Sequence, residues 1–106
     1  MINFDPSVLI GKTLKSILVD RSMPNVEVVK FIDATRKVYP FRHEYLDIFP
    51  IIGDMNNIVN SPILTSKVVT NNHDNIMHTL IISTIKGSVQ FKWIGEIKYK
   101  LIENKA

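Results

Sequence analysis

The 106-residue sequence contains no cysteine. This absence excludes disulfide bonds, thiolate metal sites and catalysis by a cysteine nucleophile. A chain without cysteine is also typical of proteins from reducing compartments, so we expect a cytoplasmic location.

Long hydrophobic runs are missing as well. The most apolar stretches, residues 48–52 and 80–82, are far shorter than the ~20 residues that span a bilayer. Residues 1–5 lack the basic and apolar regions of a secretory signal. Hydrophobic residues make up 45% of the chain and charged residues 22%, which is a globular balance. We therefore expect a soluble protein without membrane contact, folded as one small domain over residues 1–106.

Alanine, the best helix former, is almost absent, with only Ala34 and Ala106. The 16 isoleucines, 10 valines and 6 threonines are instead β-branched, which makes 32 of the 106 residues. Such side chains lose rotamer freedom in helices and pack well on pleated sheets. The composition predicts a mainly β fold, α+β at most.

Alternating apolar and polar residues, separated by turn residues, predict six to seven strands in a small antiparallel barrel or sandwich. Pro40 cannot donate to a ladder, so its strand is expected at a sheet edge or at a bulge. Asp54 is placed to cap one short helix over residues 55–59. The expected strands cover residues 13–19, 26–32, 36–42, 63–70, 76–85, 88–94 and 97–101. The expected core contains Leu14, Ile63, Leu80, Ile82, Val89, Phe91 and Trp93.

The net charge of +3 is unevenly distributed along the chain. Residues 1–85 contain eight basic and eight acidic residues, whereas residues 86–106 contain five lysines and two glutamates. One interpretation is a solvated strand face whose lysines discourage edge pairing. The other is a shallow basic surface for an anion such as a nucleotide.

Two histidine clusters have both a structural and a chemical interpretation. His73 and His78, with Asp74 between them, have metal-ligating side chains, but surface polar residues are the simpler explanation. His43, Glu44 and Asp47 form the densest acid–base cluster, although the two carboxylates also suit the first turn of a short helix. We expect no metal and no cofactor.

The sequence contains none of the phosphate-binding, dinucleotide-binding or hydrolase motifs that identify common enzyme classes. Phe91, Trp93 and Tyr99 have the rings needed to stack on bases, as in single-strand nucleic-acid binders. The same residues lie on the apolar face of their expected strands, which favours core packing.

Several short strings in order resemble a family of short proteins of unknown function, encoded largely by tailed bacteriophages and prophages. The resemblance covers about residues 11–100 and implies a phage accessory protein, without a transferable activity. The strings are Gly11–Ile17, His43-Glu44, Gly53-Asp54, Ser61–Leu64 and Lys86–Val89, followed by Trp93 and Gly95.

The chain also departs from this family pattern. Family members carry a Cys-Cys-Glu-type element between the His-Glu and Gly-Asp strings. Here residues 45–50 form a shorter stretch without cysteine. Any family site that depends on those residues is lost or rebuilt in this chain.

Our first hypothesis is a non-catalytic inhibitor of bacterial antiviral defence in the host cytoplasm, which sequesters a nucleotide signal or blocks a defence protein. The second hypothesis is a single-stranded nucleic-acid-binding β-barrel, and the third is a nucleotide-processing enzyme that uses His43. We expect a homo-oligomer, most simply a two-fold dimer. The residues expected to bind an anionic nucleotide are Arg42, His43, Lys86, Lys92 and Lys98.

Overall fold

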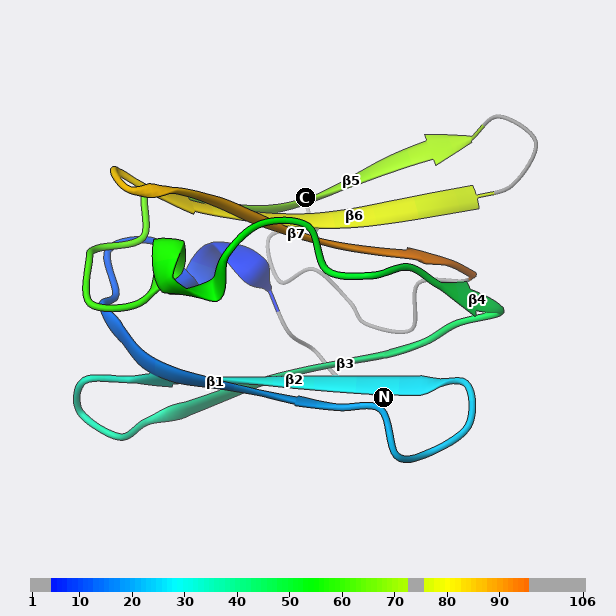
Figure 1. Cartoon of the computed structure of the whole chain (residues 1–106), viewed down its shortest axis with the longest axis horizontal. Coiled ribbons are helices and arrows are strands. Elements are labelled where there is room, and N and C mark those ends of the chain that lie inside the picture. The colour runs from blue at the N-terminus through cyan, green and yellow to red at the C-terminus, as the bar shows by residue number, and fades with distance from the viewer. Residues whose placement is uncertain (1–4, 73–75, 96–106) are drawn as a thin grey trace, which may run out of the picture.

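The computed structural model describes residues 5–72 and 76–95. Two antiparallel sheets face each other as a β-sandwich, with the core between them (Figure 1). The mainly β prediction is confirmed, and of the two expected architectures the described residues form the sandwich. The expected strand over residues 97–101 lies outside the described residues.

One sheet has three strands in the order β1-β2-β3, and the other has four in the order β4-β7-β6-β5. Consecutive strands pair within β1 to β3 and within β5 to β7, as expected for hairpins. The strands are β1 (Leu14–Asp20), β2 (Val26–Asp33), β3 (Val38–Glu44), β4 (Asp47–Ile48), β5 (Thr65–Asn72), β6 (Ile76–Thr84) and β7 (Gly87–Ile94).

The core forms where the inward faces of the two sheets meet. Phe31 from β2 and Phe91 from β7 pack edge to face, with ring centroids 6.1 Å apart. Alternation along each strand sends every second side chain inward, which buries one face of each sheet. The seven core residues expected from the sequence are all buried, so that prediction is confirmed.

Two short 3-10 helices, η1 (Pro6–Leu9) and η2 (Met55–Ile58), lie at the level between the two sheets (Figure 1). The side chain of Asp54 accepts a hydrogen bond from Asn56 N at 2.9 Å, so the predicted cap is confirmed. The expected helix over residues 55–59 is a 3-10 helix and ends one residue earlier.

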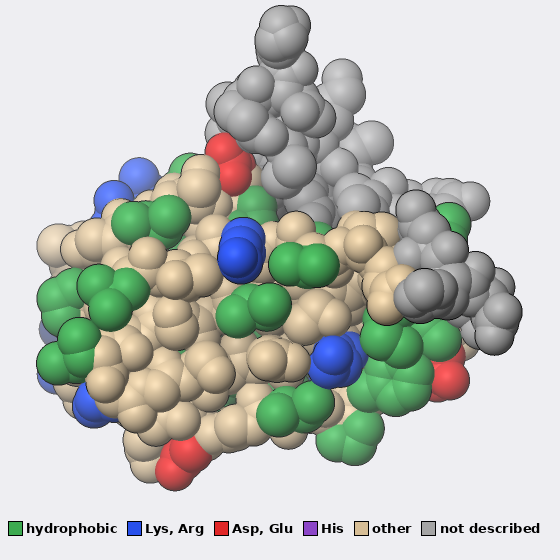
Figure 2. Space-filling model, turned by 90° about the horizontal axis from the view of Figure 1, so that it is seen from above, with side chains coloured by type: hydrophobic (Ala, Val, Ile, Leu, Met, Phe, Trp, Pro, Cys, Tyr) green, Lys and Arg blue, Asp and Glu red, His purple; other side chains and the backbone are tan. Residues whose placement is uncertain are grey.

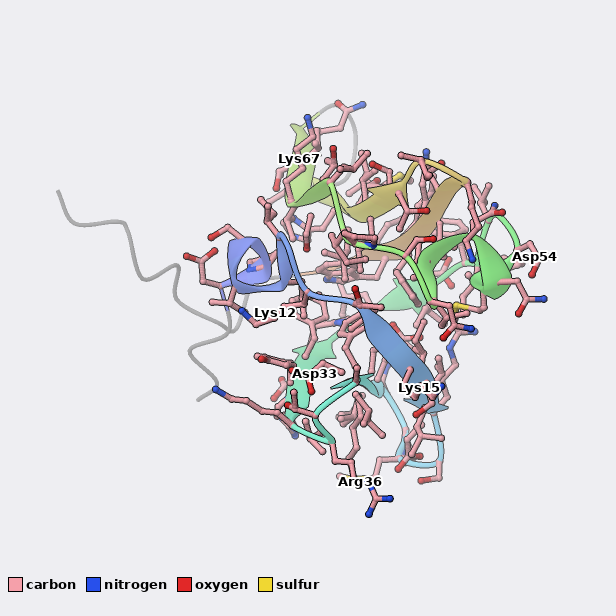
Figure 3. All side chains as sticks on the ribbon, turned by 90° about the vertical axis from the view of Figure 1, so that its left-hand side faces the viewer. Lys12, Lys15, Asp33, Arg36, Asp54 and Lys67 are labelled. Atoms are coloured by element: carbon pink, nitrogen blue, oxygen red, sulfur yellow. The ribbon has the colours of Figure 1, made fainter. Side chains whose placement is uncertain are left out.

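The third strand begins at Val38 and not at residue 36 as expected. Asp33 is the reason, because its carboxylate accepts hydrogen bonds from the backbone N–H groups of Thr35 and Lys37. Arg36 has φ +71° in this turn, which Figure 3 shows at the end of the three-stranded sheet. Pro40 lies in β3, an edge strand, as the sequence predicted.

The helical turn considered for Glu44 and Asp47 is wrong. Glu44 ends β3, and Asp47 begins the two-residue strand β4, which pairs with β7. The chain therefore crosses from one sheet to the other within a few residues, and this crossing leaves no length for a helix. No helix among the described residues is long and apolar enough to span a bilayer.

Gly53 has φ +101°, and a Cβ atom there would lie 2.4 Å from the carbonyl oxygen of Ser88. Gly53→Ala is therefore expected to lower the free energy of unfolding by about 3 kcal/mol, from strain plus a backbone clash. Gly11 is the matched control, because it has φ +86° but open space around its Cβ position. Gly11→Ala is expected to cost only about 1 kcal/mol. Urea denaturation of both variants measures the difference, and equal losses would contradict the clash.

Candidate functional site

The residues expected to bind a nucleotide lie on different surfaces. Arg42 is on the outer face of the three-stranded sheet, where its Nη1 atom lies 3.5 Å from Glu44 Oε2. Lys92 is on the outer face of the other sheet, on the opposite side of the sandwich. Because the core separates these faces, one small ligand cannot contact both side chains.

The other expected ligand residues do not complete a site either. Lys86 is in the turn between β6 and β7, and its Nζ atom donates to the carbonyl oxygen of Val59 at 2.6 Å. His43 faces the core and is fully buried. Lys98 lies outside the described residues. The structure therefore does not bring the expected set together.

His43 instead belongs to a buried charged group that the sequence reasoning missed. Its Nε2 atom lies 2.9 Å from Glu27 Oε1, and Arg21 Nε donates to Glu27 Oε2 at 2.6 Å. Glu27 and His43 are 1% and 0% exposed, whereas the Arg21 side chain is 35% exposed. The strands thus place the Glu27 carboxylate and the His43 ring in contact inside the sandwich, and Arg21 covers this contact from the surface.

The ring of Trp93 packs against this group. It stacks on His43 with centroids 3.9 Å apart, and His78 lies on it at 5.3 Å in a tilted arrangement. The Nδ1 atom of His43 and the Nε1 atom of Trp93 are buried without a hydrogen-bond partner. The group is therefore polar but incompletely paired, which makes it sensitive to a change of charge.

The pKa of Glu27 results from opposing effects. Burial alone would raise this pKa, but the contacts with His43 and Arg21 outweigh burial and lower it below the ordinary value. Glu27 is thus held as a carboxylate. Both Glu27 and His43 are buried, at 1% and 0% exposure.

His78 is held by two hydrogen bonds. Its Nε2 atom donates to the carbonyl oxygen of Gly95 at 2.8 Å, so Nδ1 accepts from the Thr70 hydroxyl at 2.9 Å in the neutral ring. His73 and Asp74 lie outside the described residues. Within residues 5–72 and 76–95, no group of three or more histidine, aspartate or glutamate side chains is placed to hold a metal ion.

The pKa of His78 is lowered, mainly by burial and in part by His43, although its hydrogen bond to Gly95 acts in the opposite direction. The unfolded chain therefore binds a proton on His78 more readily than the native protein does. Stability is fully present above the ordinary value near 6.5 and falls as the pH drops below it. Urea denaturation at pH 7.5, 6.0 and 5.0 measures this fall.

His78→Gln is expected to flatten the pH dependence of stability below the ordinary histidine value of 6.5. A separate loss, which begins below the ordinary Glu27 value of 4.5, is expected to persist in that variant. An unchanged slope in His78→Gln would contradict the assignment.

The outer face of β5, β6 and β7 is the other feature of interest. These three strands contain no aspartate or glutamate, and their two lysines, Lys67 and Lys92, both face outward. Figure 2 shows this side of the molecule with basic side chains in the middle of the face and acidic ones only near its margin. Counting charge by chain segment missed this face, because Lys67 lies in the segment whose charges cancel.

No family model, no curated protein and no solved structure matches this chain. The resemblance to short bacteriophage proteins therefore stays a prediction.

Proposed function

We propose that this protein is a non-catalytic binding protein that acts on a larger partner through the outer face of β5, β6 and β7. The observation that carries the proposal is the absence of carboxylates from these strands, together with the shared direction of Lys67 and Lys92. A face of this charge favours an acidic partner surface. With the resemblance to phage proteins, the proposed partner is a bacterial antiviral-defence protein that this chain blocks in the host cytoplasm.

The geometry of the face favours a protein over a small nucleotide. Register and strand spacing place the Cα atoms of Lys67 and Lys92 about 12 Å apart. Between them lie the partly exposed Ile81 and Gln90, a mixture of apolar and polar side chains that is typical of protein interfaces. Small ligands are usually enclosed in concave sites, and the side chains in Figure 2 form an open face.

The two alternative functions have less support. Single-strand binding needs exposed rings, but Phe91 and Trp93 are 1% and 0% exposed, and Tyr99 lies outside the described residues. Nucleotide processing by His43 needs an accessible base, and His43 is covered by the core.

The test compares the wild type with the double variant Lys67→Glu/Lys92→Glu. Each immobilised protein is incubated with lysate from bacteria that carry one antiviral defence system, and phage plaque numbers are counted in cells that express each protein. We expect the wild type to retain a component of that system and to raise plaque numbers. For the double variant, we expect the amount of retained component and the rise in plaque numbers both to fall at least about tenfold. Lys30→Glu, an exposed lysine on the opposite sheet, is the matched control and is expected to behave as the wild type.

Calorimetry with cyclic and linear signalling nucleotides distinguishes the other mechanism. Stoichiometric nucleotide binding that is lost in Lys67→Glu/Lys92→Glu would replace the protein partner with nucleotide sequestration. Recovery of a cleaved nucleotide would move the protein to the enzyme class.

A further inference from the structure

Within residues 5–72 and 76–95 the two sheets have four edge strands, and three of them carry features that prevent pairing with another chain. An open edge presents unpaired N–H and C=O groups, which proteins protect with prolines, bulges or very short strands. β3 contains Pro40, β1 has a register shift between Leu14 and Ser16, and β4 has only two residues.

β5 has none of these three features, and its only protection against edge pairing is the charge of Lys67. It is eight residues long, contains no proline, and keeps a continuous register with β6 from Thr65 to Asn72. Lys67 is its only charged residue. Among the described residues, the backbone of β5 pairs only with β6, although alternate residues of an edge strand direct their N–H and C=O groups outward.

The pictures place β5 at the border of the molecule. Figure 1 shows it as the outermost strand of its sheet, and Figure 3 shows Lys67 at the periphery. The helix η1 contacts β5, but the buried Leu9 of η1 belongs to the core, so this contact comes from the inner side of the sheet.

We propose that the free edge of β5 pairs with β5 of a second copy of this chain, antiparallel about a two-fold axis at Val68. The two four-stranded sheets then form one continuous sheet across the dimer. In this register Val68 lies opposite Val68 of the partner subunit, so Lys67 lies opposite Val69 of the partner subunit. Both residues are on the outer face, as direct pairing requires, since opposite residues in an antiparallel pair share a face.

A second copy fits this edge because the strand is self-complementary. Each of residues 65–71 lies opposite a residue of the same segment in the partner subunit. Ser66 lies opposite Thr70 of the partner subunit, which pairs two hydroxyl side chains. A two-fold axis at Lys67 would instead place two ammonium groups directly opposite, which is unfavourable. The charge of Lys67 thus favours the register whose two-fold axis lies at Val68.

The dimer goes beyond the proposed function and can fail independently of it. Lys67→Glu places a carboxylate opposite Val69 of the partner subunit and introduces no like-charge pair in this register. The variant Lys67→Glu/Lys92→Glu is therefore expected to remain a dimer but to lose binding to the defence protein.

Sedimentation velocity of the full chain at about 10 to 200 µM tests the proposal. The chain has a mass of 12.1 kDa, so the wild type is expected to sediment as a particle of twice that mass. Val69→Lys places two lysines opposite each other on each side of the two-fold axis. This variant is expected to raise the dimer dissociation constant at least about tenfold. Because Val69 is 45% exposed on the outer face, this variant is expected to keep the wild-type circular dichroism and Trp93 fluorescence.

The double variant Lys67→Glu/Val69→Lys creates two opposite-charge pairs across the axis and is expected to restore the dimer. Gln90→Lys, which adds a lysine to the same face on β7, is the matched control and is expected to dimerise as the wild type. A monomeric wild type at about 200 µM, or a Val69→Lys variant that dimerises normally, would overturn the β5 interface. A folded double variant that stays monomeric would overturn the register.

Discussion

Trp93→Ala is expected to lower the free energy of unfolding by about 4 kcal/mol, the usual cost of emptying a large aromatic site in a core. Trp93 is 0% exposed and contacts two rings of the facing sheet, stacking on His43 at 3.9 Å and meeting Phe41 edge to face at 5.8 Å. The two sheets meet at this ring, so the cavity would lie between them and would not be closed by a shift of one strand. For a domain of this size, the melting temperature is expected to fall by more than about 15 °C.

Trp93→Phe separates the effect of volume from the effect of the indole N–H. Trp93 Nε1 is buried without a hydrogen-bond partner, so its removal relieves one unsatisfied group while some volume is lost. We expect a cost of about 1 to 2 kcal/mol for this variant. Leu46→Ala, at a residue that is 81% exposed, serves as the surface control and is expected to change stability by less than about 0.5 kcal/mol. If Trp93→Ala were as stable as the wild type, the ring would be a surface platform and the core described here would be wrong.

The fold could be predicted because its cause is local. The alternation of Val89, Phe91 and Trp93 with polar neighbours defines a buried strand face without knowledge of any partner strand. The strand boundaries were harder to predict than the strands themselves. The start of β3, for example, depends on hydrogen bonds that the Asp33 carboxylate accepts from residues two and four positions later. The order of β4 beside β7 was not predictable, because it joins segments that are far apart in the sequence.

The candidate sites were less predictable than the fold. Grouping Arg42 with His43 overlooked that adjacent strand residues face opposite sides, so one lies at the surface and the other in the core. A signal for the buried charge was nevertheless present. Glu27 shares a strand face with Val29 and Phe31, and an acid on an apolar face needs a cationic partner. Which partner it meets depends on tertiary contacts, because Arg21 and His43 approach it from different segments.

Removing the carboxylate of Glu27 is therefore expected to have the second large effect on stability. Glu27→Ala is expected to lower the free energy of unfolding by about 3 kcal/mol, since it leaves the buried His43 without its partner. Arg21 contributes less to this loss, because its partly exposed side chain can turn to water and keeps one contact with the carbonyl oxygen of Phe49. Glu27→Gln retains the shape of the side chain, so an intermediate loss of about 1 to 2 kcal/mol is expected.

The exposed pair on the outer face of the same sheet provides the comparison. Arg42 and Glu44 are 3.5 Å apart with side chains 35% and 46% exposed, so Glu44→Gln is expected to cost less than about 1 kcal/mol. The pH dependence distinguishes charge from shape at Glu27. Because its pKa is lowered in the native protein, the wild type loses stability as the pH falls below 4.5, and Glu27→Gln is expected to reduce that loss. Equal costs for Glu27→Ala and Glu44→Gln in urea denaturation would show that the buried pair does not stabilise the contact between the two sheets.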